Sequence, residues 1–489
     1  MVQGKDDLMM TQCNEGPLHV KSLGRREVVA NFEGGQIASD AGALLLEQAD
    51  LGAEATERLA ACFRDRRDPD RIEHTVCELV RQRVYGLALG YEDLNDHDEL
   101  SRDPLLATAA GKTDPQGQDR LRERDEGRPL AGKSTLNRLE LTAEDAAADE
   151  RSWRYKKIEL DFAAAERVLV EVFLDSRAEP PASIVLDFDA TDDPLHGRQE
   201  GRFFHGHYDA YCYLPLYVFC GDDVLVAKLR PSNIDASAGT RDVLAWLVPR
   251  IRARWPDVHI TVRADSGFAR EAIMAWCEAN GVDYVFGLAR NERLKTALAE
   301  ELDAARVHCA ATGAPARVFK DFTYRTRSSW SRPRRVVGKA EHLPGGPNPR
   351  FVVTSLSPDA WPARALYEDL YCARGEMENR IKEQQLCLFA DRTSAATLRA
   401  NQIRLWFSAL AYTLVQTVRR VGLAHTPMAR ARCDTIRLKL LKIGAMIRVT
   451  VRRVWVRMAT SYPHQELFRT VWRRLTRFAR RPRFTPLRC

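Results

Sequence analysis

The sequence predicts an α/β protein built around one mixed β-sheet, with a β-rich insertion in that core, a helical N-terminal domain and a basic helical C-terminal region. Three patterns support this fold class. Apolar residues recur at helical spacing between Ala41 and Leu89. Short apolar runs that are typical of strands alternate with helical segments from about Ser183 to Leu288. Basic residues then dominate from Arg392 to the end.

The N-terminal helical domain is predicted to span residues 1–150. Its clearest helix is indicated by the apolar spacing in Val76–Leu89. The stretch Tyr91–Asp98 that follows is rich in the oxygen ligands that calcium prefers, but it lacks the central glycine and the spaced terminal glutamate of an EF-hand loop. We therefore interpret it as an acidic surface loop.

The segment Gly127–Ser134 matches the phosphate-binding loop pattern of nucleotide-binding proteins. Such a loop must leave a buried strand and enter a helix, and the preceding Asp119–Glu126 is too charged to be that strand. We therefore expect no nucleotide site here. Instead, Ser134 and Thr135 are predicted to cap a helix that begins at Leu136.

The α/β core is predicted to span residues 151–430. The expected elements are, in order, strands Ile184–Asp189, Tyr211–Phe219 and Val224–Leu229, a helix Thr240–Arg254, a strand His259–Ala264, a helix Ala269–Asn280 and a strand Tyr284–Leu288. Three strands in a meander followed by alternating helix and strand indicate one mixed sheet. Strands return between Val318 and Thr354, which places a β-rich insertion at about 300–358. Helices are then expected from Ala363 almost to the end.

The charge of the chain is distributed unevenly. The net charge is +7, but Arg392–Cys489 holds 22 lysines and arginines against two acids, Asp434 and Glu466. Such asymmetry predicts a polyanionic partner, either nucleic acid or an anionic membrane surface. We assign residues 431–489 as a basic helical tail.

Membrane and secretory classes are not favoured by the sequence. The most apolar stretch, Leu405–Val418, is interrupted by polar residues and is shorter than the roughly 20 residues that a bilayer span needs, so we expect a buried or amphipathic helix. The eleven cysteines include no Cys-x-x-Cys pair, and the first residues lack the pattern of a secretory signal. This usage suits reduced thiols in a cytoplasm.

Acidic residues stand at the ends of two predicted strands. The first strand ends in Asp187-Phe188-Asp189, and Asp265 follows the fourth. Reactive groups gather where the strands of an open α/β sheet end. Asp187 and Asp189 point to the same face because side chains alternate along a strand. We choose Asp189 as the site residue and leave Asp187 as an alternative ligand or a supporting acid.

A helix after the insertion supplies a third acid. At about 100° per residue, Glu378 falls on the stripe of this helix that we assign to the site, and Glu376 faces elsewhere. The other members of the stripe are Tyr371, Arg374, Lys382 and Gln385. They add donors and positive charge where a phosphate would pass. As an alternative, Arg374 and Lys382 are only solvated charges of the helix.

Two strand-end aspartates and a helical glutamate make a set of hard oxygen ligands that suits Mg²⁺ or Mn²⁺. Two such ions about 4 Å apart can activate a water or a 3′-hydroxyl and stabilise the leaving oxygen of an in-line phosphodiester displacement. The sequence therefore predicts Asp189, Asp265 and Glu378 as the metal ligands and catalytic residues of a phosphoryl-transfer enzyme.

These residues resemble the DDE-type transposases of bacterial insertion sequences, in the branch marked by a Tyr-x2-Arg-x3-Glu-x6-Lys signature. Tyr371, Arg374 and Glu378 fit the signature, and Gln385 stands where it has lysine, which keeps a donor but loses the charge. Further segments that resemble this group are Gly90–Asp98, Ser134–Glu140, Asp189–Thr191, His205–Asp209 and Asp265–Phe268. The resemblance extends over about residues 30–430.

The resemblance implies an RNase H-like core with a β-rich insertion, and cut-and-paste transposition with Mg²⁺ or Mn²⁺. It implies an N-terminal domain that binds the terminal inverted repeats, a homodimer in the DNA complex, and action at the nucleoid in a bacterial cytoplasm. In related enzymes a tryptophan of the insertion stacks on a flipped base, and Trp330 is the candidate here. The alternative is that Trp330 belongs to the core of the insertion.

Three further alternatives stay open. His205 and His207 could chelate a metal, although a hydrogen-bonded loop is the interpretation we favour. The chain could be a catalytically inactive, transposase-derived DNA-binding regulator. It could also be a two-metal nuclease that does not transfer strands.

Overall fold

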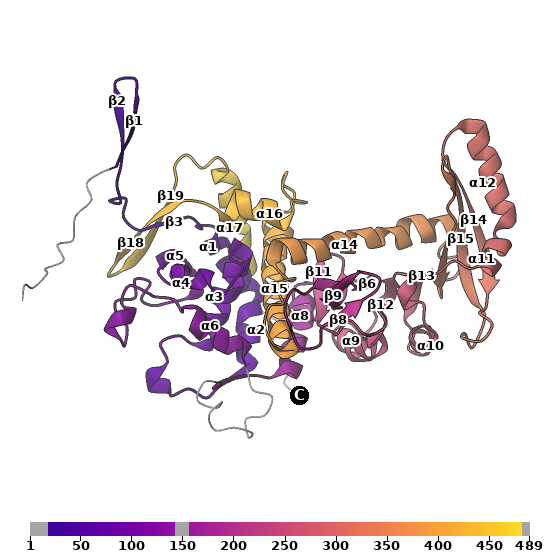
Figure 1. Ribbon diagram of the computed structural model, residues 1–489, viewed down its shortest axis with the longest axis horizontal. Helices are drawn as coiled ribbons and strands as arrows, with labels where there is room; N and C mark the ends of the chain where they lie inside the picture. The colour runs from indigo at the N-terminus through magenta and orange to yellow at the C-terminus, as the bar shows by residue number, and fades with distance from the viewer. Residues whose placement is uncertain (1–17, 142–155, 482–489) are drawn as a thin grey trace, which may run out of the picture.

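The computed structural model describes residues 18–141 and 156–481 (Figure 1). A long mixed sheet crosses one half of the molecule, and the N-terminal and C-terminal elements gather at one end of it. The strands of the insertion lie at the other end. A long, nearly continuous helical segment that includes α14 runs across the sheet from the insertion back to the C-terminal elements.

Among the first five strands of the sheet, some neighbouring pairs are antiparallel and others are parallel. They are β6 (Ser183–Ala190), β10 (Leu216–Cys220), β11 (Asp223–Lys228), β12 (His259–Ala264) and β13 (Asp283–Leu288). Their order is β11-β10-β6-β12-β13. The strand β10 is antiparallel to both β11 and β6, whereas β12 is parallel to both β6 and β13. The predicted mixed sheet is confirmed.

The helices and strands of the core largely follow the predicted ones. The helix α9 (Thr240–Arg254) and the strand β12 have the predicted bounds, and α10 (Glu271–Ala279) lies within its predicted range. The expected strand Tyr211–Phe219 is wrong as a single element. It is divided into β9 (Ala210–Tyr213) and β10, with Pro215, which has no N–H for a sheet ladder, between them.

The insertion extends the core sheet. Its strands are β14 (Ala316–Tyr324), β15 (Arg334–Leu343), β16 (Gly346–Pro347) and β17 (Arg350–Thr354). They continue the sheet in the order β13-β17-β15-β14, with β16 beside β15 and β17 antiparallel to β13. Its helices are α11 (Glu292–Ala297) and α12 (Ala299–Thr312), and α12 packs on β14 and β15. The predicted range 300–358 therefore begins with a helix.

The two faces of the sheet are covered by different helices. On one face Phe188, Val262 and Phe286 pack in a core with the buried residues of α9 and α10. On the other face Val285 and Val352 pack against the start of the helical segment that follows the insertion. This second face carries the predicted site.

The N-terminal region is mainly helical within residues 18–141. Its helices are α1 (Ala43–Ala53), α2 (Ala55–Ala61), α3 (Val76–Leu89), α4 (Asp96–Leu100), α5 (Pro104–Ala110) and α6 (Lys133–Glu140), with short 3₁₀ turns η1 (Pro69–Arg71) and η2 (Glu123–Asp125). Its strands are β1 (Leu18–Leu23), β2 (Arg26–Ala30), β3 (Ile37–Ala38) and β4 (Phe63–Asp65), which pairs with β5 (Ile158–Leu160). The hairpin β1–β2 projects from the body (Figure 1).

The predicted cap of the last N-terminal helix is wrong. The helix α6 begins at Lys133, and neither Ser134 nor Thr135 caps it. The Lys133 N–H donates to the Asp98 carboxylate at 3.0 Å, and the Lys133 ammonium lies 3.2 Å from the same side chain. The carboxylate of Asp98 therefore binds the first turn of α6 through both the backbone and the side chain of Lys133.

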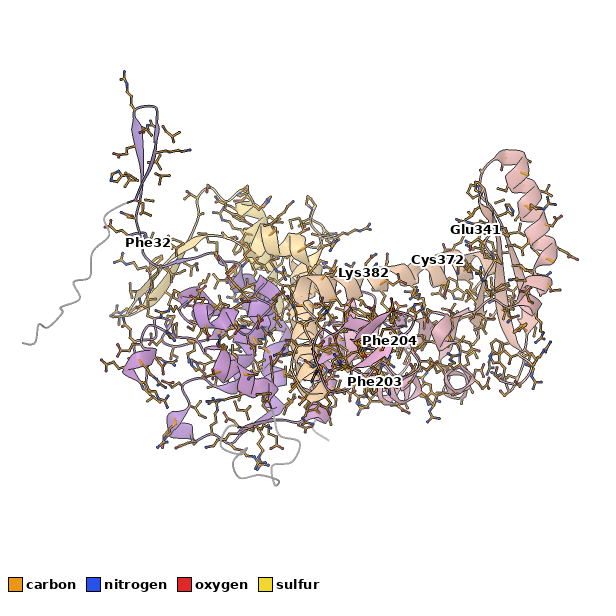
Figure 2. All side chains as sticks on the ribbon, viewed as in Figure 1. Phe32, Phe203, Phe204, Glu341, Cys372 and Lys382 are labelled. Atoms are coloured by element: carbon orange, nitrogen blue, oxygen red, sulfur yellow. The ribbon has the colours of Figure 1, made fainter. Side chains whose placement is uncertain are left out.

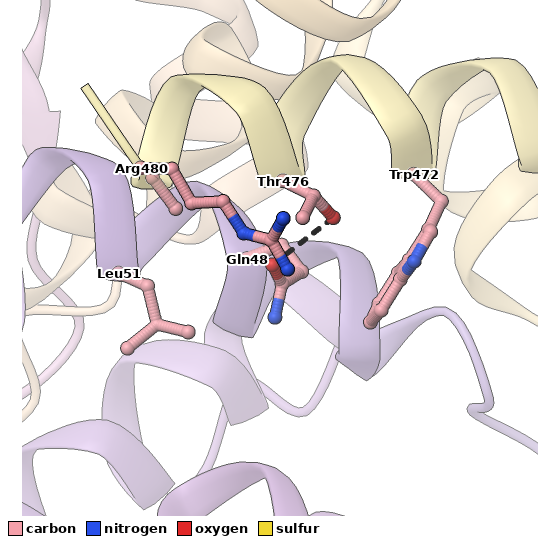
Figure 3. A pocket seen from close by; sticks show the side chains of 6 residues that line it. Gln48, Leu51, Trp472, Thr476 and Arg480 are labelled. Carbon is pink, nitrogen blue, oxygen red and sulfur yellow. Dashed lines mark hydrogen bonds between the residues drawn. The ribbon is translucent and has the colours of Figure 1, made fainter.

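The C-terminal region is packed into the body. The helix α15 (Leu398–Thr417) is buried along nearly its whole length, which confirms the predicted buried helix. The helix α8 (Phe162–Asp175) shares a core with α15 and the N-terminal helices. Figure 3 shows α17 (Gln465–Ala479) beside α1, where the Thr476 hydroxyl donates to the Gln48 side-chain oxygen at 3.4 Å above a cavity of 440 Å³.

The prediction that helices continue almost to the end of the chain is wrong for the segment that precedes α17. This segment follows α16 (Cys433–Ile436) and the π turn η8 (Arg437–Leu441). A hairpin of β18 (Ala445–Thr450) and β19 (Arg453–Met458) lies there and pairs with β3. Along β18, buried Ala445 and Ile447 alternate with exposed Met446 and Arg448, a pattern that suits a half-buried strand. Within the described residues, no helix is both long and apolar enough to cross a membrane.

Candidate active site

Two aspartates lie side by side at the ends of β6 and β12. These strands are parallel neighbours, and their register places Asp187 opposite Arg263. Continued two residues further, the same register brings Asp189 next to Asp265, and both side chains stay on one face because side chains alternate along a strand. Asp265 also caps a short turn, η3 (Ser266–Phe268), by accepting from the Gly267 N–H at 2.8 Å. The edge of the sheet therefore fixes the position of both carboxylates.

Asp187 forms a buried ion pair with Arg263. Its two oxygens accept from Nε and Nη2 of Arg263 at 2.5 and 2.7 Å, and the same guanidinium donates to the carbonyl of Leu370. Only 2% of Asp187 is exposed. Burial raises the pKa of Asp187, and Arg263 opposes that shift. The geometry therefore assigns Asp187 to the packing of the sheet against the helical segment above it, and leaves Asp189 as the accessible carboxylate.

The helical segment above the acids is irregular. It comprises α13 (Ala363–Ala365), the π turn η4 (Leu366–Tyr371), the 3₁₀ turn η5 (Cys372–Arg374), α14 (Gly375–Lys382) and the π turn η6 (Glu383–Cys387). Leu366, Tyr367 and Leu370 anchor its first part on the sheet. The π and 3₁₀ turns change the angular spacing between residues, and such irregularities are frequent at functional sites.

The Tyr371 side chain lies at the strand ends where the acids are located. A Cβ atom on Gly287 would be 2.5 Å from the Tyr371 hydroxyl oxygen and 2.9 Å from the backbone nitrogen of Ser266, so only glycine leaves room for this contact. Burial raises the pKa of Tyr371, with Asp265 adding to the shift and Arg374 opposing it. The hydroxyl is therefore held beside Asp265 in its protonated form.

Arg374 connects the strand-end acids to Glu378. Its guanidinium is 2.5 Å from Glu378 Oε1 and 3.8 Å from Asp189 Oδ2. Glu378 is still 42% exposed, whereas Asp189 is 15% exposed. Glu376 is exposed, and its charge acts on Asp187. Arg374 links Glu378 to Asp189, and the choice of Glu378 over Glu376 as a site residue stays a prediction.

The electrostatics of this cluster are those of crowded carboxylates. Burial, which is the largest influence, and the charges of Asp265 and Glu378 together raise the pKa of Asp189 to about 7, while Arg374 opposes the shift. Like charges within a few ångströms disfavour ionisation, and a cation among them favours it. The three acids therefore act on one another electrostatically, and Arg374 supplies part of the positive charge that the cluster needs.

The other residues of the predicted stripe have different surroundings. Lys382 is exposed near the far end of α14 (Figure 2). Gln385 is turned toward the loop after β6, where its Nε2 donates to the Asp192 carbonyl at 3.0 Å. Gln385 thus ties the helix to the loop that follows Asp189.

Trp330 is 4% exposed, in the loop between β14 and β15. Its ring packs edge-on against Tyr324 at 5.7 Å, and the Arg334 guanidinium lies 5.5 Å from its centroid. These contacts correspond to the alternative in which Trp330 belongs to the core. A base could stack on it only after this loop had opened.

Sequence reasoning missed two groups of residues near the acids. Arg290 follows β13, and Arg350 begins β17; both are exposed and line a cavity of 350 Å³ that Tyr371 and Ser266 also line. The position of Arg290 after a strand is the signal that could have found it. Tyr208 is the second: the acids Asp192, Asp189 and Asp265, after burial, raise its pKa to about 12.

The donor chemistry of the three acids fits a divalent metal. Asp189, Asp265 and Glu378 offer hard oxygen atoms. Burial is the main cause of the raised pKa of Asp189, and the neighbouring acids add negative charge that a cation would compensate. Within residues 18–141 and 156–481, no three acidic, histidine or cysteine side chains are already arranged to hold a metal ion. Glu378 is instead oriented toward Arg374.

A mixed sheet with acids gathered at its strand ends, beneath a helix that carries a third acid and an arginine, offers the groups that metal-assisted phosphoryl transfer uses. The comparison with protein families gives its class. The model of the family "Transposase DDE domain group 1" matches residues 20–480, so the chain belongs to this transposase family.

Comparison with individual proteins adds little. No curated protein matches the chain. Among solved structures, the piggyBac transposase synaptic complex with hairpin DNA is similar at 12% identity and a TM-score of 0.41, over 91% of this chain and 81% of that one. At that level of similarity it carries no argument about this chain.

Proposed function

We propose that the protein is a cut-and-paste transposase of a bacterial insertion sequence, which cleaves DNA at the element ends and joins the freed 3′-hydroxyls to target DNA. The observation that carries the proposal is the convergence of Asp189, Asp265 and Glu378, from two adjacent strands and one helix, into a single electrostatic cluster. The family match is consistent with this chemistry.

The strand order supports an RNase H-like assignment for the core. The chain enters the sheet at β6, adds β10 and β11 as an antiparallel meander on one side, and then adds β12 and β13 in parallel on the other. This order leaves the ends of β6 and β12 adjacent, with their acids on one face. The extension by β17, β15 and β14 is the insertion that the resemblance implies.

We assign the metal-binding role to Asp189, Asp265 and Glu378. When bound, two Mg²⁺ or Mn²⁺ ions would activate the attacking hydroxyl and stabilise the leaving oxygen. Glu378 must release Arg374 to join the two aspartates, and the freed guanidinium can then bind a phosphate oxygen with its planar fork. Tyr371, held as a neutral hydroxyl beside Asp265, can donate a hydrogen bond to the same DNA backbone.

The surrounding cations give DNA a path to the acids. Arg290 and Arg350 line the cavity beside Tyr371, and Lys382 lies exposed on α14. These three side chains extend the positive charge of Arg374 along the proposed path of the strand. Gln385 orients the loop after Asp189.

The basic C-terminal region supplies attraction for duplex DNA. The outward face of β18 and β19 carries Arg448, Arg453 and Arg457 around Trp455, and these residues are exposed. The inward face, with Ile447 and Val456, packs on the shared core. Substitution of surface arginines is therefore the suitable test, because deletion of this region would remove β18 and α17 from the core.

The catalytic proposal is tested with DNA that contains the inverted repeats of the element, in the presence of Mn²⁺. Wild-type protein should cleave it and join the ends to a supercoiled target, and the variants Asp189→Ala, Asp265→Ala and Glu378→Ala should not. Equal inactivity of all four proteins, with binding retained, would identify a DNA-binding regulator. Cleavage without joined products would identify a nuclease.

The partner and oligomer proposals are tested on the same DNA. Affinity for any duplex should fall steeply with salt. Substitution of Arg448, Arg453 and Arg457 by alanine should reduce the slope of that dependence by about three, one for each phosphate that is no longer neutralised. Pairing of two ends requires two copies of the chain, so the mass of the complex should correspond to a homodimer on two DNA ends.

A further inference from the structure

A small sheet continues the strand pairing of the core sheet beyond the acids of the site. It consists of β7 (Asp193–Pro194), β8 (Phe203–His205) and β9, in the order β7-β9-β8. The strand β6 leads through Asp192 into β7, and β9 leads into β10, so the pairing of β6 with β10 is followed by the pairing of β7 with β9. The hairpin β8–β9 is therefore attached to the end of the strand that carries Asp189.

One face of this hairpin presents aromatic rings to solvent. Phe204 and Tyr211 are directly opposed across the two strands, with ring centroids 5.7 Å apart and planes at 73°. The Arg202 guanidinium lies 4.5 Å from the centroid of Tyr211. Phe204 is 54% exposed and Tyr211 is 47% exposed, and Figure 2 shows Phe204 with its neighbour Phe203 below the helix that carries Lys382.

The hairpin is held in place from behind. Cys212, next to Tyr211, is fully buried. The Ser232 hydroxyl donates to the Phe203 carbonyl at 2.9 Å, and the Tyr213 hydroxyl donates to the Glu200 carbonyl at 2.6 Å. The exposed rings thus belong to an anchored surface, and their exposure is not the result of a loose segment.

The turn of the hairpin faces the acids. Tyr208, in that turn, is half-buried, and the electrostatic influence of Asp189 and Asp265 reaches it. The rings of His205 and His207 each lie 4.9 Å from the Tyr208 ring and 6.4 Å from each other. A strand that passes the carboxylates would therefore meet the aromatic face next.

We propose that Phe204, Tyr211 and Arg202 form a binding site for an unpaired nucleobase of the DNA strand at the active site. The proposal rests on the proposed action on DNA. An exposed aromatic face with an adjacent guanidinium stacks on any base, since every base has a π face, and the cation adds attraction. Trp330, by contrast, is buried, whereas Phe204 and Tyr211 are exposed.

The test compares two DNA probes in a metal-free buffer, where no cleavage occurs. One is a fully paired duplex; the other has the same sequence with a short single-stranded flap that contains 2-aminopurine. The wild-type protein should bind the flapped probe more tightly and quench the 2-aminopurine fluorescence. The double variant Phe204→Ala/Tyr211→Ala should lose about tenfold in affinity for the flapped probe and nothing for the paired one.

The controls separate stacking from folding and from general exposure. Phe204→Trp should keep both the affinity and the quenching. Phe32→Ala removes a ring that is fully exposed in the N-terminal region, and it should change neither probe. An abasic residue in the flap should weaken wild-type binding as much as the double variant does, without any further loss when the two changes are combined.

Three results would overturn the proposal. The double variant could bind both probes as the wild type does, or lose affinity for both equally. It could also change the sedimentation of the free protein, which would show that the face is a contact between copies of the chain. Because the assay contains no metal, failure of the catalytic proposal would leave its outcome unchanged.

Discussion

The face of the sheet beneath the segment Ala363–Cys387 has two acidic regions that differ sharply, although they begin only two residues apart on β6. In the inner region Asp187 is buried, and both of its oxygens are bound by Arg263. In the outer region Asp189 is accessible, and its arginine is 3.8 Å away and shared with Glu378. The inner carboxylate is neutralised by a fixed partner, whereas the outer one is surrounded by other carboxylates.

This difference separates an acid that holds the structure together from acids that can do chemistry. A buried ion pair with complete hydrogen bonding resists the removal of either partner. A cluster of carboxylates with one partial counter-charge costs stability, and such clusters persist where a bound cation gives them a function. Each of the following predictions tests one side of this contrast.

The largest effect is expected in the outer region. Asp189→Ala should reduce cleavage of end-containing DNA by at least about 1000-fold, because several kcal/mol of transition-state stabilisation depend on the ligand set. The free energy of unfolding in urea should not fall, because burial already disfavours the ionised form of this carboxyl group. A loss of stability equal to that of an Asp187 variant would remove the distinction between the two regions.

The matching change in the inner region should affect stability instead. Asp187→Ala leaves Arg263 buried and unpaired, so the free energy of unfolding should fall by about 3–5 kcal/mol. Urea denaturation measures it. The double variant Asp187→Leu/Arg263→Met should recover part of the loss, since no unpaired charge stays buried. A fall below about 1 kcal/mol for the single variant would contradict the structural role.

The two arginines give a matched third test. Arg374→Lys should lower cleavage by roughly 10- to 100-fold, because lysine cannot bridge Glu378 and Asp189 with a planar fork and loses about 1.5–3 kcal/mol of charged hydrogen bonding. Its stability should hardly change, since Glu378 is 42% exposed and water screens the ion pair. Arg263→Lys should show the reverse: lower stability, and activity reduced only in proportion to the folded fraction. Equal effects of the two substitutions on cleavage would place both arginines in the site.

Much of the outer region follows from the sequence, because local rules determine it. Strand ends locate Asp189 and Asp265, and the helical stripe selects Glu378 over Glu376. Arg374 and Glu378 are four residues apart across the start of α14, so they lie on the same side of the segment although π and 3₁₀ turns interrupt it. Periodicity also gives the bounds of α9 and β12.

The inner region does not follow from local rules. The pairing of Asp187 with Arg263 depends on the register between two strands that are far apart in the chain, and no pattern within either strand reveals it. The burial of Trp330 depends in the same way on contacts with Tyr324 and Arg334. The hairpin Ala445–Met458 also escapes local rules, because a run of three apolar residues interrupts the alternation in each of its strands.

The smallest effect is expected at Gln385, whose side chain contacts the loop after Asp189. Gln385→Lys restores the lysine of the signature and should raise the salt dependence of DNA binding by about one phosphate contact, which corresponds to a few-fold gain in affinity at low salt. It gives up the hydrogen bond to the Asp192 carbonyl, so stability should fall by about 1 kcal/mol or less. Gln385→Met is the control, because it loses the same bond without adding charge. If lysine and methionine gave the same salt dependence, the side chain at this position would lie outside the path of the DNA, and its contact with the loop would be its whole role.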